Sequence, residues 1–176
     1  MTPLSNDWEE RLSALWASID DQSEDQFLAS MELLLAELPP NSALARFEWA
    51  GSLDSTGHSD LAVPLYRQAL ELGLSGECRR RAVIQLASSL RNLGQASESA
   101  ALLMAERQLG SDGLDDAISA FLALALVDLG REREAVSLAL SALSGHLTRY
   151  RRSLANYATQ ISEPPSAPPA EQIEPG

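Results

Sequence analysis

Arginine is the residue type in this sequence with the clearest capacity for binding chemistry. All thirteen basic residues are arginine, and lysine is absent. A guanidinium group presents a planar fork of hydrogen-bond donors that matches carboxylates and phosphates. The absence of lysine excludes Schiff-base chemistry, a lysine general base and the phosphate-binding lysine of Walker-type loops.

Two clusters of arginine stand out along the chain. The run Arg79–Arg81 begins a predicted helix, where the positive end of the helix dipole disfavours cations. We therefore expect acidic neighbours or a ligand to offset this charge, and Glu77 supplies part of the compensation locally. The second cluster is Arg149, Arg151 and Arg152. We expect it to meet acids of a neighbouring helix or to remain in water.

The residues that usually carry catalysis or bind metals are few and scattered. Cys78 is the single cysteine, and His58 and His146 are far apart in the sequence. They form no cysteine cluster, no metal-ligand motif and no Ser/His/Asp arrangement. The acidic residues between Asp20 and Asp25 lack the spaced glycine and the final glutamate of a calcium loop. We therefore predict no catalytic residues, no cofactor and no metal, and we predict that the protein is not an enzyme.

Charge is distributed unevenly along the chain. The 25 acidic and 13 basic residues give a formal charge of −12. Residues 1–40 contain nine acids and one arginine, whereas residues 41–162 contain thirteen acids and twelve arginines. Residues 163–176 add three acids and hold five of the nine prolines, which predicts a disordered, Pro-rich acidic tail. The negative charge disfavours nucleic acid as a partner.

The overall composition favours a helical protein. Hydrophobic residues make up 45% of the chain and aromatic residues only 5%, a bias that favours helices over a β-sandwich. The start of the sequence shows neither the basic region nor the apolar run of a signal peptide. The longest apolar stretch, residues 120–127, is far shorter than the ~20 residues that a membrane span requires. We expect a cytoplasmic protein with no membrane partner.

A repeat of 36 to 37 residues organises the middle of the chain around three glycines, Gly57, Gly94 and Gly130. Three columns recur around them: an alanine seven residues before each glycine, a leucine four before it and a small residue five after it. In that order the columns are Ala50, Ala87 and Ala123; Leu53, Leu90 and Leu126; and Ala62, Ser99 and Ala135. A further column holds Ala69 and Ala142 but Glu106 in the middle unit, which departs from the pattern.

This spacing describes pairs of helices in close contact. An alanine in the first helix lets the second helix approach, and apolar residues three or four positions away share its face. The glycine ends the first helix, where a positive φ is often required. One pair cannot bury its apolar face alone, so neighbouring pairs must stack.

The columns resemble the tetratricopeptide repeat. The segments FEWAGSLDSTGHSDLAVPLYRQALELGL and RRRAVIQLASSLRNLGQASESAALL are similar to the bacterial group 5 tetratricopeptide domain in particular. The resemblance implies an all-α fold: an α-solenoid of stacked antiparallel helix pairs, with about three and a half to four repeats. Residues 41–145 correspond to three repeats, and residues 146–162 are predicted to form a helix that caps the last apolar face.

Residues 1–40 resemble a degenerate N-terminal pair. Trp16–Ala17 stands where Trp49–Ala50 does in the next unit, and three small or apolar residues follow in step: Ala29, Leu33 and Ala36. Helix ends are predicted from capping chemistry. Ser23 with Gln26 predicts a capping box, and the predicted N-caps of the next three first helices are Asn41, Ser75 and Asp112. The sequence thus predicts nine helices and essentially no strand.

In tetratricopeptide solenoids the first helices of the pairs line a concave surface, and the resemblance implies which positions face it. In the middle unit the +4, +7 and +11 spacing from Arg81 also places the implied residues on one helical stripe. The predicted peptide-binding groove consists of Phe47, Glu48, Asp54, Arg81, Gln85, Ser88, Arg91, Asn92, Phe121 and Asp128.

The predicted function is that of a non-enzymatic scaffold or adaptor, which binds a protein or peptide segment in this groove. Arginine suits carboxylates and Asn92 offers a donor and an acceptor to a peptide backbone, so the favoured ligand is an extended acidic segment or a C-terminus. An alternative for the arginines is that Arg81 and Arg91 only pair with Glu48, Asp54 or Asp128.

An alternative function is also open. The chain would then be a structural, self-associating protein, in which the N-terminal pair or the capping helix forms a homodimer. Tyr150 and Tyr157 on the capping helix distinguish the two functions, because they face either the core or an identical partner.

Overall fold

The computed structural model describes residues 6–162 and, within them, contains nine α-helices, one short 3-10 helix and no strand. The elements are α1 (Asn6–Ala17), η1 (Ile19–Asp21), α2 (Glu24–Leu35), α3 (Ala43–Ser55), α4 (Ser59–Glu71), α5 (Gly76–Asn92), α6 (Ala96–Glu106), α7 (Asp115–Asp128), α8 (Glu132–His146) and α9 (Arg151–Ser162). The predicted all-α class is confirmed. The predicted tail, residues 163–176, lies outside the described residues.

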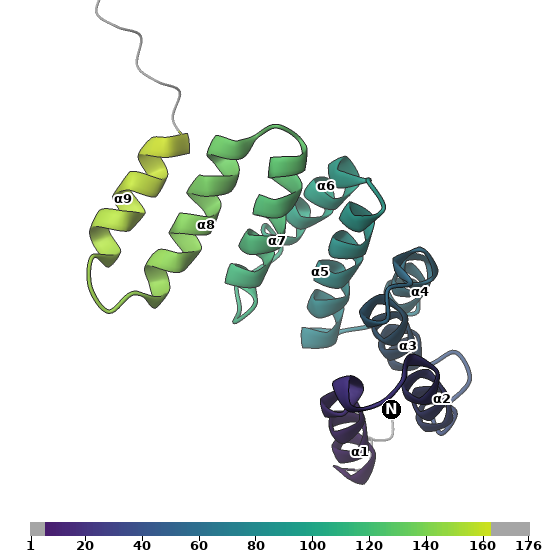
Figure 1. Ribbon diagram of the computed structural model, residues 1–176. Helices are drawn as coiled ribbons and strands as arrows, with labels where there is room; N and C mark the ends of the chain where they lie inside the picture. Colours follow the sequence, from purple (N-terminus) through teal and green to yellow (C-terminus); the bar gives the residue numbers. More distant parts are fainter. Residues whose placement is uncertain (1–5, 163–176) are drawn as a thin grey trace, which may run out of the picture.

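The helices follow one another along an arc, with α1 at one end and α9 at the other (Figure 1). Each α-helix packs against the next one in the sequence. Helix α5 also contacts α3 and α7, so the first helices of the three central pairs lie side by side. This arrangement is the predicted helical solenoid. None of the described helices is long and apolar enough to cross a lipid bilayer.

The repeat columns are buried in the central pairs. Ala50 and Ala87 are completely buried, and the leucines Leu53, Leu90 and Leu126 are at most 7% exposed. Two apolar clusters result, one around α3, α4 and α5 and one that extends from α5 to α8. The spacing therefore predicted the seam between helices correctly in these units.

The three repeated glycines end α3, α5 and α7 in the same way. Their φ angles are 95° for Gly57, 78° for Gly94 and 71° for Gly130, in the left-handed region that favours glycine. In each case the residue after the glycine donates its N–H to the carbonyl of the repeated leucine, at 2.8 to 2.9 Å. This is the Schellman motif, and it explains why leucine and glycine keep their spacing of four.

The N-terminal pair does not follow the predicted columns. Ala29, Leu33 and Ala36 are exposed, and Leu33 is 74% exposed. The opposite side of α2 is buried instead, through Phe27 and Met31, which are both completely buried. These larger side chains remove more apolar area from water than two alanines can. The in-step alignment of this first unit was therefore wrong.

Capping chemistry was predicted correctly at one helix start and less well at the others. Ser23 and Gln26 form the predicted capping box of α2. The N-cap of α3 is Ser42, whose Oγ accepts from Ala45 N at 3.2 Å, and not Asn41. Asn41 has a φ of 61°, a conformation that asparagine tolerates better than most residues.

The other two predicted caps also differ. Ser75 occupies the N-cap position of α5, but its side chain makes no capping hydrogen bond. Asp112 lies ahead of α7 and accepts from Leu114 N at 2.7 Å, so it stabilises the turn that leads into the helix.

Helix α9 packs on α8 at the end of the array. The capping helix was predicted over residues 146–162. Helix α9 begins later, at Arg151, because α8 continues through Gly145 to His146. Ala158 is completely buried, and its carbonyl accepts a hydrogen bond from Ser137 Oγ at 2.7 Å. Tyr150 and Tyr157 do not face the core, because they are 78% and 61% exposed.

Candidate functional site

The surface formed by α3, α5 and α7 carries most of the predicted groove residues. Two contacts of α5 define it: Arg81 lies over a side chain of α3, and Arg91 pairs with a side chain of α7. We call this surface the first-helix face. Its residues with solvent exposure include Arg81, Gln85, Ser88, Asn92, Phe121 and Leu124.

Arg81 is the available cation of the first-helix face. Its guanidinium carbon lies 5.4 Å from the centroid of the Phe47 ring, which is a cation–π arrangement. The side chain is exposed, and it makes no ion pair within residues 6–162. The alternative prediction held that Arg81 pairs with Glu48, Asp54 or Asp128. Within residues 6–162, Arg81 forms none of these pairs.

Arg91 is paired across the stack. Its Nε lies 2.6 Å from Asp128 Oδ2, and its Nη2 donates to Asp128 Oδ1 at 3.2 Å. Both side chains are about one-third exposed, so this pair contributes little to stability. For Arg91 the structure matches the alternative prediction of an internal ion pair.

Phe47 and Glu48 lie beneath the face and not on it. Phe47 is 2% exposed and Glu48 is 5% exposed. Burial raises the pKa of the Glu48 carboxyl, and the hydrogen bond from Trp16 and the charge of Arg81 act in the opposite direction. The predicted groove residue Glu48 thus supports the surface from below.

Trp16 joins this site from the N-terminal pair, and sequence reasoning did not include it. Its Nε1 donates to Glu48 Oε2 at 2.8 Å, and its ring lies 5.4 Å from that of Phe27. Gly51 faces the Trp16 ring, which is 3.4 Å from the position that a Cβ would occupy. No local sequence signal indicates this contact, because Trp16 and Glu48 are 32 residues apart.

The remaining predicted residues divide into a polar part and an apolar part. Asp54 accepts from Ser59 Oγ at 2.7 Å, and Asn92 is exposed at the end of α5. On α7, Phe121 is half-buried and Leu124 is 45% exposed. A ligand on the first-helix face would therefore meet polar groups of α5 beside apolar groups of α7.

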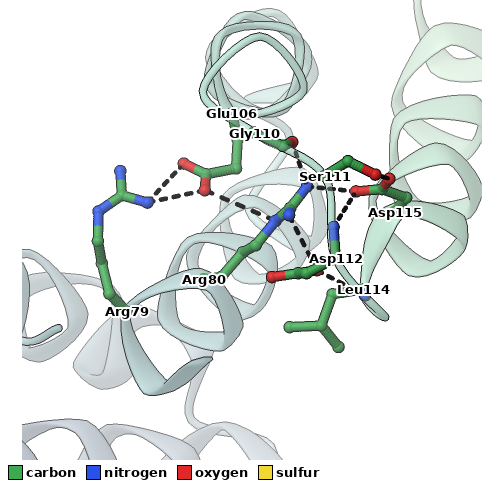
Figure 2. Close-up of polar contacts among 8 residues, drawn as sticks. All are labelled: Arg79, Arg80, Glu106, Gly110, Ser111, Asp112, Leu114 and Asp115. Carbon is green, nitrogen blue, oxygen red and sulfur yellow. Dashed lines mark hydrogen bonds and ion pairs between the residues drawn. The ribbon is translucent and has the colours of Figure 1, made fainter. Parts of the chain in front are cut away.

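A second polar cluster lies where α5 begins, and Figure 2 shows its contacts. Arg79 Nη1 donates to both carboxylate oxygens of Glu106, at 2.7 and 2.9 Å. Arg80 Nη2 donates to Asp115 Oδ1 at 2.6 Å, and its Nη1 lies 2.8 Å from Asp112 Oδ1. The side chains of Arg80 and Glu106 are 8% and 4% exposed.

This cluster explains two features of the sequence. The acidic neighbours expected for the arginine run are present, and Glu106 departs from the repeat column because it holds Arg79. Hydrogen bonds from Ser111 and from Asp112 N, together with Arg80, lower the pKa of the Asp115 carboxyl. A hollow of about 680 Å³ lies beside the cluster, but both arginines that line it are already paired.

The described part of the chain contains no cluster of side chains suited to bind a metal ion. Within residues 6–162, no group of three or more His, Cys, Asp or Glu side chains is placed to hold a metal ion. Each histidine has a carboxylate partner instead: His58 lies 2.6 Å from Glu24, and His146 lies 2.7 Å from Asp116.

Comparison with known families agrees with the helical architecture. The family model described as Tetratrico peptide repeat, of bacterial group 5, matches residues 43–161 of the 176. The match begins with α3 and runs almost to the end of α9, so it covers every helix of the first-helix face. A search of curated proteins gives no match.

Proposed function

Because the chain belongs to the tetratricopeptide repeat family, we propose that it is a non-enzymatic scaffold that binds a protein or peptide segment on the first-helix face. Members of this family generally bind proteins or peptides. The partner would lie across α3, α5 and α7, which are in mutual contact through α5.

The observation that supports this proposal is that Arg81 is exposed and forms no ion pair within residues 6–162. Of the three arginines that begin α5, Arg79 and Arg80 are paired with acids, whereas Arg81 is exposed on the Phe47 ring. A charged side chain held over an aromatic ring loses part of its freedom before any ligand arrives, which lowers the entropic cost of binding. Arg81 is thus a preorganised contact for an anionic group.

The surroundings of Arg81 favour a particular kind of ligand. A guanidinium binds a carboxylate through two parallel hydrogen bonds, so we propose an acidic segment or a C-terminal carboxylate at this position. Asn92 would hold the peptide backbone, and the exposed Leu124 and half-buried Phe121 would contact an apolar side chain. Arg91 has a smaller part, because Asp128 already neutralises it.

The test uses the full chain against a displayed library of random peptides with free C-termini. Selected peptides are then measured by calorimetry against the wild type and Arg81→Gln. A hydrogen bond to a charged group contributes about 1.5–3 kcal/mol, so Arg81→Gln should weaken binding roughly tenfold or more. Amidation of the peptide C-terminus tests whether that carboxylate is the group recognised.

Arg107→Gln is the matched control, because Arg107 is also exposed, makes no ion pair within the described residues and follows α6, outside the first-helix face. The control should bind as the wild type does. Equal affinity of the wild type and Arg81→Gln, with both proteins folded by circular dichroism, would refute the assignment of Arg81 as a ligand contact.

A further inference from the structure

The two ends of the helical arc carry opposite charge. Residues 6–40, which form α1, η1 and α2, contain nine acids and one arginine, Arg11. Residues 147–162, which lead into and form α9, contain three arginines and no acid. Figure 1 places α1 and α9 at opposite ends of the arc, so these two surfaces of one molecule do not meet.

Most acids of the N-terminal pair have no cationic partner among residues 6–162. Arg11 pairs with Asp7 at 3.0 Å and Glu37 at 2.6 Å, and His58 lies beside Glu24. Within the described residues, no ion pair is formed by the other six acids of this pair: Glu9, Glu10, Asp20, Asp21, Asp25 and Glu32.

Helix α2 adds an apolar stripe to this acidic surface. Ala29, Leu33 and Ala36 lie at positions i, i+4 and i+7, share one side of the helix and are exposed. Asp25 continues the stripe towards the helix start, and Glu32 flanks it. We call these five residues the acidic end surface. The opposite side of α2 already supplies the core, so this stripe is an unpartnered helix face.

The start of α9 forms a surface of complementary character, which we call the basic end surface. It consists of Arg149, Tyr150, Arg151, Arg152 and Tyr157, all of them exposed. The three arginines make no ion pair within residues 6–162, and the tyrosines are 78% and 61% exposed. Tyrosine and arginine are the residue types that protein–protein interfaces enrich, because each combines a large apolar body with a polar end.

We infer that the basic end surface of one molecule binds the acidic end surface of a second copy of this chain. The arginines at the start of α9 pair with Asp25 and Glu32, and the tyrosines pack on the stripe around Leu33. Contact between two acidic ends or two basic ends would bring like charges together and is disfavoured. The complementary surfaces occur once each on every chain, so a second copy supplies each surface with its partner.

This contact joins unlike surfaces and uses no residue of the first-helix face. Self-association and peptide binding at Arg81 can therefore be tested independently of each other. Two copies can form it twice and close a dimer, or successive copies can form it in an open chain. Exposed charges are screened by salt, so the association is weak at high ionic strength.

The experiment is a charge exchange followed by sedimentation velocity of the full chain at about 100 μM. One variant carries Asp25→Arg and Glu32→Arg, and the other carries Arg151→Glu and Arg152→Glu. The wild type should self-associate in about 0.05 M salt and dissociate at least about tenfold more readily in about 0.5 M salt. Each variant alone should be monomeric, because its acidic end surface and its basic end surface now carry the same sign.

A mixture of the two variants gives the decisive result. The reversed acidic end surface of the first variant matches the reversed basic end surface of the second, and their unchanged end surfaces also match, so a 1:1 mixture should associate again. Asp60→Arg with Glu71→Arg on α4 is the matched control: these exposed acids also lie in the first turn and at the end of a helix. This control should self-associate as the wild type does.

Three results would overturn the inference. The wild type could be monomeric at low salt, either variant alone could associate as strongly as the wild type, or the mixture could fail to associate. Circular dichroism of each variant, compared with the wild type, ensures that a loss of association is not a loss of folding.

Discussion

Glu106 stands where the repeat pattern has alanine, so Glu106→Ala restores the pattern and at the same time removes the partner of Arg79. Pattern and physical chemistry give opposite expectations for this substitution. The pattern alone implies a stable or stabilised protein, as for Ala69, which is completely buried at the same column. The structure implies a loss of stability, because the Glu106 carboxylate is 4% exposed and accepts two hydrogen bonds.

The magnitude follows from the exposure of each partner. Removal of one member of a fully buried ion pair costs about 3–5 kcal/mol. Arg79 is 38% exposed and can be rehydrated, and Arg80 keeps Asp112 and Asp115, so we lower the cost to about 2–3 kcal/mol. Glu106 ends α6, where removal of a negative charge returns about 0.3–1 kcal/mol. The lost hydrogen bonds dominate, and the net loss is about 1–3 kcal/mol.

Urea unfolding followed by circular dichroism measures this loss. In thermal unfolding, two to four degrees of melting temperature correspond to about 1 kcal/mol in a chain of this size, which predicts a decrease of about 2–12 °C. Trp8, Trp16 and Trp49 all lie in the first two helix pairs, so their fluorescence reports on that part alone. Coincident fluorescence and dichroism transitions would establish that the array unfolds as one unit.

Glu98→Ala is the control on the same helix, because the Glu98–Arg67 pair is about half exposed and should contribute less than about 1 kcal/mol. The combined Arg79→Ala and Glu106→Ala variant should be more stable than the sum of the single losses predicts, since Arg79 is then no longer left without its partner. An unchanged or raised melting temperature for Glu106→Ala would refute the reasoning and favour the repeat pattern.

Three further substitutions test the packing and the buried polar groups. Ala87→Leu should overpack the central seam and cost about 1–3 kcal/mol, whereas Ala101→Leu on an exposed position should be neutral in the same urea titration. Burial raises the pKa of the Glu48 carboxyl in the folded protein. The contribution of Glu48 to stability therefore falls as the pH rises from the ordinary pKa of a glutamate to the raised pKa of Glu48. Glu48→Gln, which keeps an acceptor for Trp16, should therefore melt above the wild type at pH ~8 and lose this advantage at pH ~4. Tyr66→Phe should change stability by less than about 1 kcal/mol, because the Tyr66 hydroxyl has no hydrogen-bond partner within the described residues; a loss above about 2 kcal/mol would show a missing partner.

The central pairs could be predicted from the sequence because their contacts are local and repeated. The leucine and glycine that end α3 lie four residues apart, and the same hydrogen bond recurs in α5 and α7. The alanine column precedes the leucine by three residues and shares its side of the helix. Such short-range geometry leaves a periodic signature, and three copies of it were enough to fix the helices and their seam.

The polar site was less predictable because its partners come from distant parts of the chain. Arg91 and Asp128 are 37 residues apart, and Trp16 and Glu48 are 32 apart. The stripe of α5 stays a prediction as a binding surface, and nothing local in the sequence distinguishes Arg81, which forms no ion pair within residues 6–162, from Arg80, which is buried among acids. Whether an arginine of α5 is paired depends on which residues of the next helix pair lie opposite its guanidinium.

The N-terminal pair shows where a repeat pattern stops predicting structure. A column stays small and apolar when helices on both sides pack against it, and α2 has a packed neighbour on only part of its surface. Phe27 and Met31 took the buried side, which left Leu33 and its alanine neighbours in water. At the other end, Ala139 is exposed although Tyr66 and Leu103 at the same column are completely buried. The array thus departs from its pattern towards its outermost described helices, where a packed neighbour lies on one side only and where unlike charges gather, and a second copy of the chain would provide a further neighbour at both.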